Sequence, residues 1–161
     1  MPSKDTDTTA RKETAAVEKS ESSERAPFDR NEKSDRIDFG TFEQILEMDD
    51  DDDREFSRAI VWGFMDQAQE TFTAMRESIE KEDLERLSSL GHFLKGSSAT
   101  LGLTTVKEYC EKIQHLGSGR DETGHADIDN PKVSLAGIKS ALDEMKKEYA
   151  HVHRYFTGYY N

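Results

Sequence analysis

Cysteine is almost absent from this chain of 161 residues, in which Cys110 is the only one. A single thiol cannot form an internal disulfide, and it cannot supply the several thiolates of a structural zinc site. The sequence also has no apolar run near the roughly 18 residues that a membrane-spanning helix requires, and no apolar segment typical of a secretory signal at its start. We therefore expect a reducing, intracellular environment and no association with membranes.

Basic residues are scarce relative to acidic ones, because 22 Lys and Arg stand against 34 Asp and Glu, for a net charge of −12. Nearly all of the excess lies in residues 37–161, which carry 25 acidic and 14 basic residues. So acidic a surface repels phosphates, and nucleic acid is not an expected partner. Residues 1–36 are balanced in charge, poor in apolar residues and without a periodic pattern. We expect them to be a disordered tail, followed by one folded domain over 37–161.

Apolar residues in that domain recur at intervals of three and four, which is the spacing of amphipathic helices. Helices are predicted over about 41–48, 53–80, 83–101 and 105–117, and from Pro131 to beyond Phe156. No segment has the alternation of a strand, and 117–129 reads as a polar loop. The sequence therefore predicts an all-α fold, an antiparallel four-helix bundle with a short extra N-terminal helix.

Local signals place the ends of these helices. Thr41 and Thr105 each have the spacing of a capping box with a Gln or Glu three residues later. Asn130 is a suitable N-cap before a proline, and Gly117 is predicted as the left-handed residue that ends the fourth helix. Cys110 falls on an apolar stripe and is predicted to lie in the core.

The predicted helix 83–101 contains residues that disfavour a helix. Gly91 and Gly96 lie inside it, where each glycine costs about 1 kcal/mol relative to alanine. On a helical wheel His92 lies opposite the leucine stripe, among small residues, with Lys95 one turn away. An imidazole that acts as a nucleophile toward another protein needs this exposure and open space, and a phosphoryl group suits a nearby cation. The alternative is an ordinary surface histidine on a helix whose glycines serve packing.

Residues 92–99 read HFLKGSSA, which resembles the signature of histidine-containing phosphotransfer (HPt) proteins. The segments MDDDDD at 48–53, DQAQ at 66–69, LGL at 101–103 and CEKIQ at 110–114 resemble the fungal phosphorelay intermediates of that family. The resemblance covers about 41–118 closely and the last helix by its pattern, but it does not extend to 1–36.

The resemblance implies that His92 is phosphorylated on Nε2, that Lys95 stabilises the phosphoryl group, that Gly96 keeps the approach open and that Gln114 orients the imidazole. It implies a carrier without kinase activity or a cofactor of its own. The phosphoryl group would come from the receiver aspartate of a hybrid histidine kinase and pass to the receiver aspartate of a response regulator, and the receiver would supply Mg²⁺. A monomer in the cytoplasm and nucleus is expected on the same ground.

Docking to a receiver requires an apolar patch beside the histidine. The residues predicted for this patch are Ile45, Met48, Val61, Phe93 and Ser97. Ile45 and Val61 are equally compatible with a place in the core. An acidic helical adaptor that binds partner proteins without carrying phosphate is the alternative function.

Two metal sites are disfavoured by the sequence. The acidic run 49–53 could begin an EF-hand loop, but Arg54 then replaces the glycine at position 6 and Ile60 replaces the glutamate at position 12. Glu148 and His151 match only half of a di-iron bundle motif. We expect the acidic run to cap the second helix instead, since negative charge is favoured at a helix N-terminus.

Overall fold

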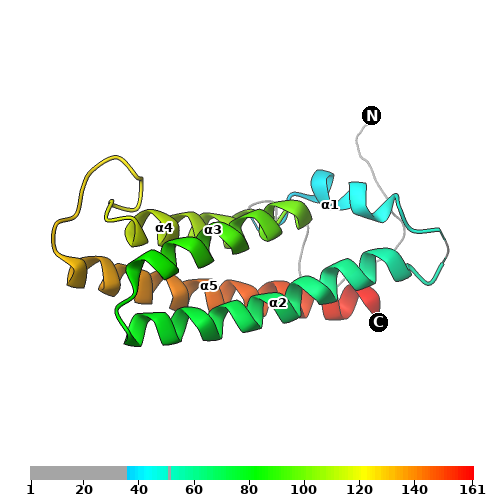
Figure 1. The fold of residues 1–161 in the computed structure, drawn as a ribbon. Coiled ribbons are helices and arrows are strands. Elements are labelled where there is room, and N and C mark those ends of the chain that lie inside the picture. Colours follow the sequence, from blue (N-terminus) through cyan, green and yellow to red (C-terminus); the bar gives the residue numbers. More distant parts are fainter. Residues whose placement is uncertain (1–35, 51) are drawn as a thin grey trace. The chain divides into compact units, whose positions relative to one another are not determined.

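The computed structural model describes residues 36–50 and 52–161. Apart from one isolated bridge between Arg120 and Asp127, the regular structure of these residues is helical. The helices are α1 (Phe39–Leu46), α2 (Glu55–Glu80), α3 (Leu84–Leu101), α4 (Thr104–Gly117) and α5 (Pro131–Tyr160) (Figure 1). The predicted all-α fold is confirmed. The predicted disordered tail lies, except for Arg36, outside the described residues.

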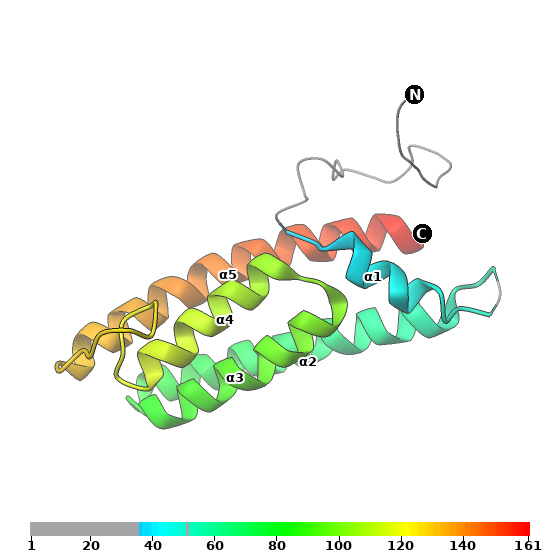
Figure 2. The same ribbon diagram turned by 90° about the horizontal axis from the view of Figure 1, so that it is seen from above.

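The chain divides into two compact units, the larger of which is Ser34–Val152. Within that unit α2, α3, α4 and the first part of α5 form the antiparallel four-helix bundle, and α1 packs against α2 and α3 (Figures 1 and 2). The last turns of α5, from His153, belong to the other unit, where Tyr155 and Tyr159 stack with ring centres 6.0 Å apart. None of the described helices combines the length and the apolar character needed to cross a bilayer.

Side chains near Val152 attach α5 to its neighbours in the bundle. The Tyr149 hydroxyl donates a hydrogen bond to the main-chain oxygen of Met65 on α2 at 3.1 Å, and its ring meets Phe72 edge-on at 5.3 Å. On the α4 side the Cys110 thiol lies 3.6 Å from the Met145 sulfur. These contacts place α5 against both α2 and α4, so all four helices share one core.

The apolar stripes predicted from the sequence point mostly inward. On α3, Leu87, Leu94 and Leu101 are at most 1% exposed, which turns the opposite face of the helix to solvent. The exception is Phe56, which fits the predicted stripe of α2 but is 44% exposed in the first turn of that helix. Periodicity alone cannot show where a helix extends beyond its neighbours. In such a segment no neighbouring helix covers the apolar stripe, and its side chains are exposed to solvent.

Two predicted helix starts are wrong. The N-cap of α1 is Asp38, whose carboxylate accepts from the main-chain N–H of Thr41 at 3.3 Å and from its hydroxyl at 2.9 Å. Thr41 is therefore the capped residue and not the cap. Helix α4 begins after Leu103, which is completely buried and offers no side-chain cap. Its main-chain oxygen accepts the Lys107 N–H at 2.9 Å, so the N-cap lies two residues before Thr105.

The acidic run caps α2, as expected, through Asp49. Its carboxylate accepts from the main-chain N–H of Ser57 at 2.8 Å and from the Ser57 hydroxyl at 2.7 Å. The carboxylate thus satisfies an N–H donor in the first turn of α2 from eight residues away. In most helices a residue directly before the helix does this. Arg54, directly before α2, has a left-handed backbone and contributes no side-chain cap. Asn130 caps α5 as predicted, accepting from the Lys132 N–H at 3.0 Å.

The end of α4 also differs from the prediction. Gly117 is the last helical residue, and the left-handed position belongs to Gly119, with φ at 81°. The Arg120 N–H bonds to the His115 carbonyl at 3.0 Å, and the Gly119 N–H bonds to the Leu116 carbonyl at 3.1 Å. These two bonds define a Schellman motif. Gly117 serves another purpose, since a Cβ there would lie 2.7 Å from the Ser88 nitrogen.

Candidate functional site

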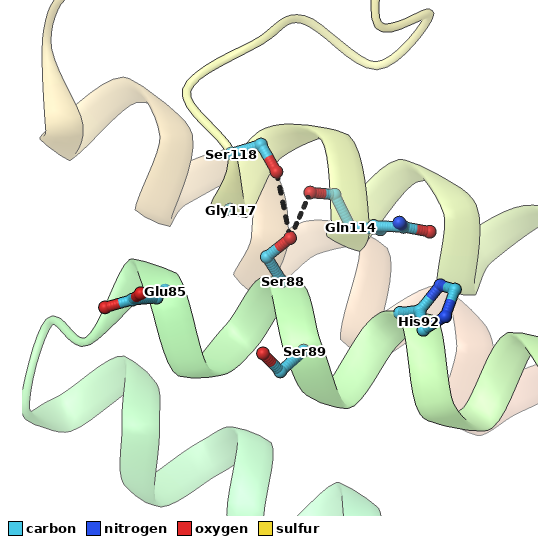
Figure 3. A pocket seen from close by; sticks show the side chains of 7 residues that line it. All are labelled: Glu85, Ser88, Ser89, His92, Gln114, Gly117 and Ser118. Carbon is cyan, nitrogen blue, oxygen red and sulfur yellow. Dashed lines mark hydrogen bonds between the residues drawn. The ribbon is translucent and has the colours of Figure 1, made fainter.

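His92 lies on the solvent-facing side of α3, opposite the buried leucines, as the helical wheel predicts. An open groove between α3 and α4 begins at this histidine and encloses about 510 Å³. Three of the side chains in its walls are serines (Figure 3). The residues that line it are Glu85, Ser88, Ser89, His92, Gln114, Gly117 and Ser118.

Gln114 extends from α4 toward the His92 ring (Figure 3). Its side-chain oxygen is buried and has no hydrogen-bond partner in the described part of the chain. A buried acceptor left in this state costs about 1–3 kcal/mol, so a structural role does not account for it. A ring N–H of the neighbouring imidazole is a donor of the required kind. The structure thus brings together the two residues that the sequence analysis placed on different helices.

Lys95, one turn after His92 on α3, is directed toward α4. Its Nζ lies 3.8 Å from the Glu111 carboxylate, and its side chain is 27% exposed. A pair this open and this long contributes little to stability. The contact with Glu111 is therefore weak, and a more highly charged anion can replace the Glu111 carboxylate. The three N–H donors of the ammonium group can rotate to meet such an anion.

The two glycines that flank His92 have opposite surroundings. A Cβ placed on Gly91 would lie 2.8 Å from the Cys110 carbonyl oxygen and 3.0 Å from the Gln114 nitrogen. Gly91 is thus required for the close approach of α3 and α4. A Cβ placed on Gly96 would meet nothing within 4 Å among the described residues outside its own turns of helix. Packing within residues 36–50 and 52–161 does not explain Gly96. The helix surface there stays open at a cost in helix propensity.

The residues predicted for docking divide into two groups. Met48 and Phe93 are 61% and 50% exposed, and Ser97 is half-buried. Val61 is completely buried and Ile45 is 9% exposed, so both belong to the core and the surface prediction for them is wrong. Their places on the inner faces of α2 and α1 follow from the helical period, which does not distinguish a core position from a semi-exposed one.

Phe56 is an exposed aromatic residue that the sequence analysis assigned to the core, and it joins Met48 and Phe93 among the large exposed apolar side chains. The only signal for it in the sequence is its position in the first turn of the predicted second helix, where cover by neighbouring helices is least.

Two further residues with nucleophilic or ligand character, Cys110 and His115, are inaccessible or already hydrogen-bonded. Cys110 is completely buried, and burial raises the pKa of its thiol to about 12, so it stays protonated. His115 shares a hydrogen bond with the Glu122 carbonyl oxygen at 2.9 Å and lies against Gly124 in the loop after α4. Across residues 36–50 and 52–161, no three His, Cys, Asp or Glu side chains gather closely enough to hold a metal ion.

The Hpt domain family model matches residues 59–151, which include α3, α4 and the histidine. The Multistep phosphorelay regulator 1 of Schizosaccharomyces pombe is 44% identical over 124 residues, which are 77% of this chain and 42% of that protein. The Phosphorelay intermediate protein YPD1 of Saccharomyces cerevisiae is 47% identical over 85 residues, which are 52% of this chain and 50% of that protein. This chain belongs to the Hpt domain family. It spans about half or less of the length of these relatives.

Solved structures show the same fold. The Saccharomyces cerevisiae histidine phosphotransfer signaling protein Ypd1, crystallised with the receiver domain of its downstream response regulator Ssk1, superposes with a TM-score of 0.70. The two chains are 34% identical, over 80% of this chain and 96% of that one. A crystal structure of yeast YPD1p alone gives a TM-score of 0.69 at 29% identity. The match supports the helical bundle.

Proposed function

We propose that this chain is a phosphorelay intermediate that carries a phosphoryl group on His92. The observation that carries the proposal is the open surface around Gly96, one turn from an exposed histidine. Packing in the part of the chain that the structure describes does not require this glycine. A partner protein needs this open space to reach the imidazole with its reacting group. Membership of the Hpt family and the likeness to Ypd1 support the same conclusion.

In the proposed reaction the Nε2 lone pair of neutral His92 attacks the phosphorus of an aspartyl phosphate on a receiver domain. The bond between phosphorus and the aspartate oxygen breaks, and its electron pair leaves with the carboxylate. The ring keeps its proton on Nδ1, and this N–H can donate a hydrogen bond to the unpaired side-chain oxygen of Gln114. That hydrogen bond stabilises the positive charge that the ring gains as the N–P bond forms. Reversal of the same steps on a second receiver completes the relay.

Lys95 would then exchange its weak contact with Glu111 for the phosphoryl oxygens. A dianion within reach of an ammonium group attracts it more strongly than a single exposed carboxylate does. The receiver brings its aspartate and the Mg²⁺ that neutralises the transferring group, so the carrier needs no cofactor and no ATP site. The proposed partners are receiver domains of a hybrid histidine kinase and of response regulators, met in the cytoplasm and nucleus by a monomer.

The decisive experiment is incubation of the protein with a phosphorylated receiver domain. We expect acid-labile, base-stable phosphate on this chain, and none on the His92→Gln variant. Labelling of that variant would assign the phosphate to another residue. If the natural sequence binds the receiver but acquires no phosphate, the carrier hypothesis is wrong and the acidic adaptor is the better description.

A further inference from the structure

Next to the groove at His92, α3 and α4 make unusually close main-chain contacts, and this line of contacts is called the seam below. Gly91 approaches the main chain of α4 near Gln114, and Gly117 approaches the main chain of α3 at Ser88. Ser88, one turn before His92 on α3, lies at the second of these contacts, beside Gly117 (Figure 3). The seam therefore joins the part of α3 that presents the histidine to the part of α4 that presents the glutamine.

The Ser88 hydroxyl bridges the seam. Its Oγ donates a hydrogen bond to the main-chain oxygen of Gln114 at 2.9 Å, and it lies 2.9 Å from the Ser118 Oγ (Figure 3). A hydroxyl has only one proton to give. Because that proton goes to Gln114, Ser118 donates to Ser88, and the three residues form one directed chain of hydrogen bonds.

These hydrogen bonds act on the last turn of α4. The Gln114 carbonyl receives the Ser118 N–H at 3.1 Å from its own helix end and the Ser88 hydroxyl from α3. The second bond is the one that ties the turn to the neighbouring helix. The side chain on that turn ends in the buried, unpaired oxygen of Gln114, directed toward His92.

We propose that Ser88 is a positioning residue for the phosphoryl transfer at His92: its hydroxyl pins the last turn of α4 to α3 and so holds the Gln114 amide at the imidazole. The inference rests on the proposed function, and it assigns a role to a residue that does not itself touch the transferred group. A small shift of a group that orients a nucleophile is enough to slow a reaction substantially.

The test uses Ser88→Ala, which removes the hydroxyl and keeps the small side chain that the seam requires. We expect transfer from a saturating phosphorylated receiver to slow by on the order of tenfold, with receiver binding unchanged. The tautomer populations of His92, read from imidazole ¹⁵N chemical shifts in the protein alone, should shift in the direction produced by Gln114→Ala. Ser118→Ala should have a smaller effect, because the bond from Ser88 to Gln114 remains.

Two further variants separate positioning from stability. Thr73→Ala on α2 is the matched control, because it removes an exposed hydroxyl that bonds only to the Gln69 carbonyl of its own helix, at 3.2 Å. It should leave transfer and the His92 spectrum unchanged. In a Gln114→Ala background, Ser88→Ala should slow transfer no further, since residues that act through one another are not additive.

The proposal is overturned if Ser88→Ala leaves the ¹⁵N shifts of His92 as they are, or if the rate losses of Ser88→Ala and Gln114→Ala multiply. A failure of the proposed function looks different. In that case the natural sequence acquires no phosphate from any receiver, while the ¹⁵N comparison, which needs no partner, still shows whether Ser88 positions the imidazole.

Discussion

Gly96→Ala should make this protein more stable and less active at the same time. A Cβ at Gly96 meets nothing within 4 Å outside its own turns, so the substitution introduces no clash. Glycine inside a helix costs about 1 kcal/mol relative to alanine, and the substitution recovers that amount because Gly96 is exposed within α3. For a domain of this size about 1 kcal/mol corresponds to a rise in Tm of roughly 4 °C.

The same methyl group enters the space that a receiver must use to reach His92. We expect slower transfer from a phosphorylated receiver to Gly96→Ala, and a fall of more than about tenfold, or about 1.4 kcal/mol in the barrier, for Gly96→Gln. Gly63→Ala on α2 is the matched control, because Gly63 is also exposed inside a helix with nothing within 4 Å of an added Cβ. It should give the same gain in Tm with no change in transfer.

Thermal unfolding followed by circular dichroism measures the first effect, and phosphate transfer under single-turnover conditions measures the second. Equal transfer by Gly96→Gln and the natural sequence would refute the argument, because open space would then have no part in the reaction. A loss of stability in Gly96→Ala would refute it as well, since it would show that packing requires the glycine.

Three further predictions concern the fold around the site. Gly91→Ala forces a methyl group against the main chain of α4 at 2.8 Å and should cost about 3 kcal/mol, seen as a lower midpoint in urea. Asp49→Ala removes the cap of α2 at Ser57 and should cost about 1 kcal/mol in the same assay; an unchanged midpoint would show that the bridge contributes nothing. Cys110 has a pKa of about 12 in the fold and 9.0 as a free thiol. Native protein at pH 8 should therefore resist thiol reagents that label it in urea, and stability should fall as the pH rises above about 9, where the unfolded chain ionises first; rapid labelling of folded protein would contradict the burial.

Much of the fold follows from local patterns. The apolar spacing, together with the local signals for helix ends, places all five helices to within about two residues at nearly every end. The same spacing turns His92 outward because Leu87 and Leu94 must turn inward. Asn130 before a proline marks the start of α5. The errors at Thr41 and Thr105 arise because another group satisfies or sets the same helix end, and a short window of sequence cannot rank such competing signals.

The sequence by itself determined the helical class, the outward histidine and the anomaly of two glycines beside it, since each depends on the period of a single helix. Only the tertiary structure decided what those glycines do: Gly91 lies at a backbone contact and Gly96 faces open space. It also buried Val61, turned Gln114 toward His92 and brought the Ser88 hydroxyl to the main-chain oxygen of Gln114. The physical reason is that these properties depend on the distance between two helices, and local propensity carries no information about that distance.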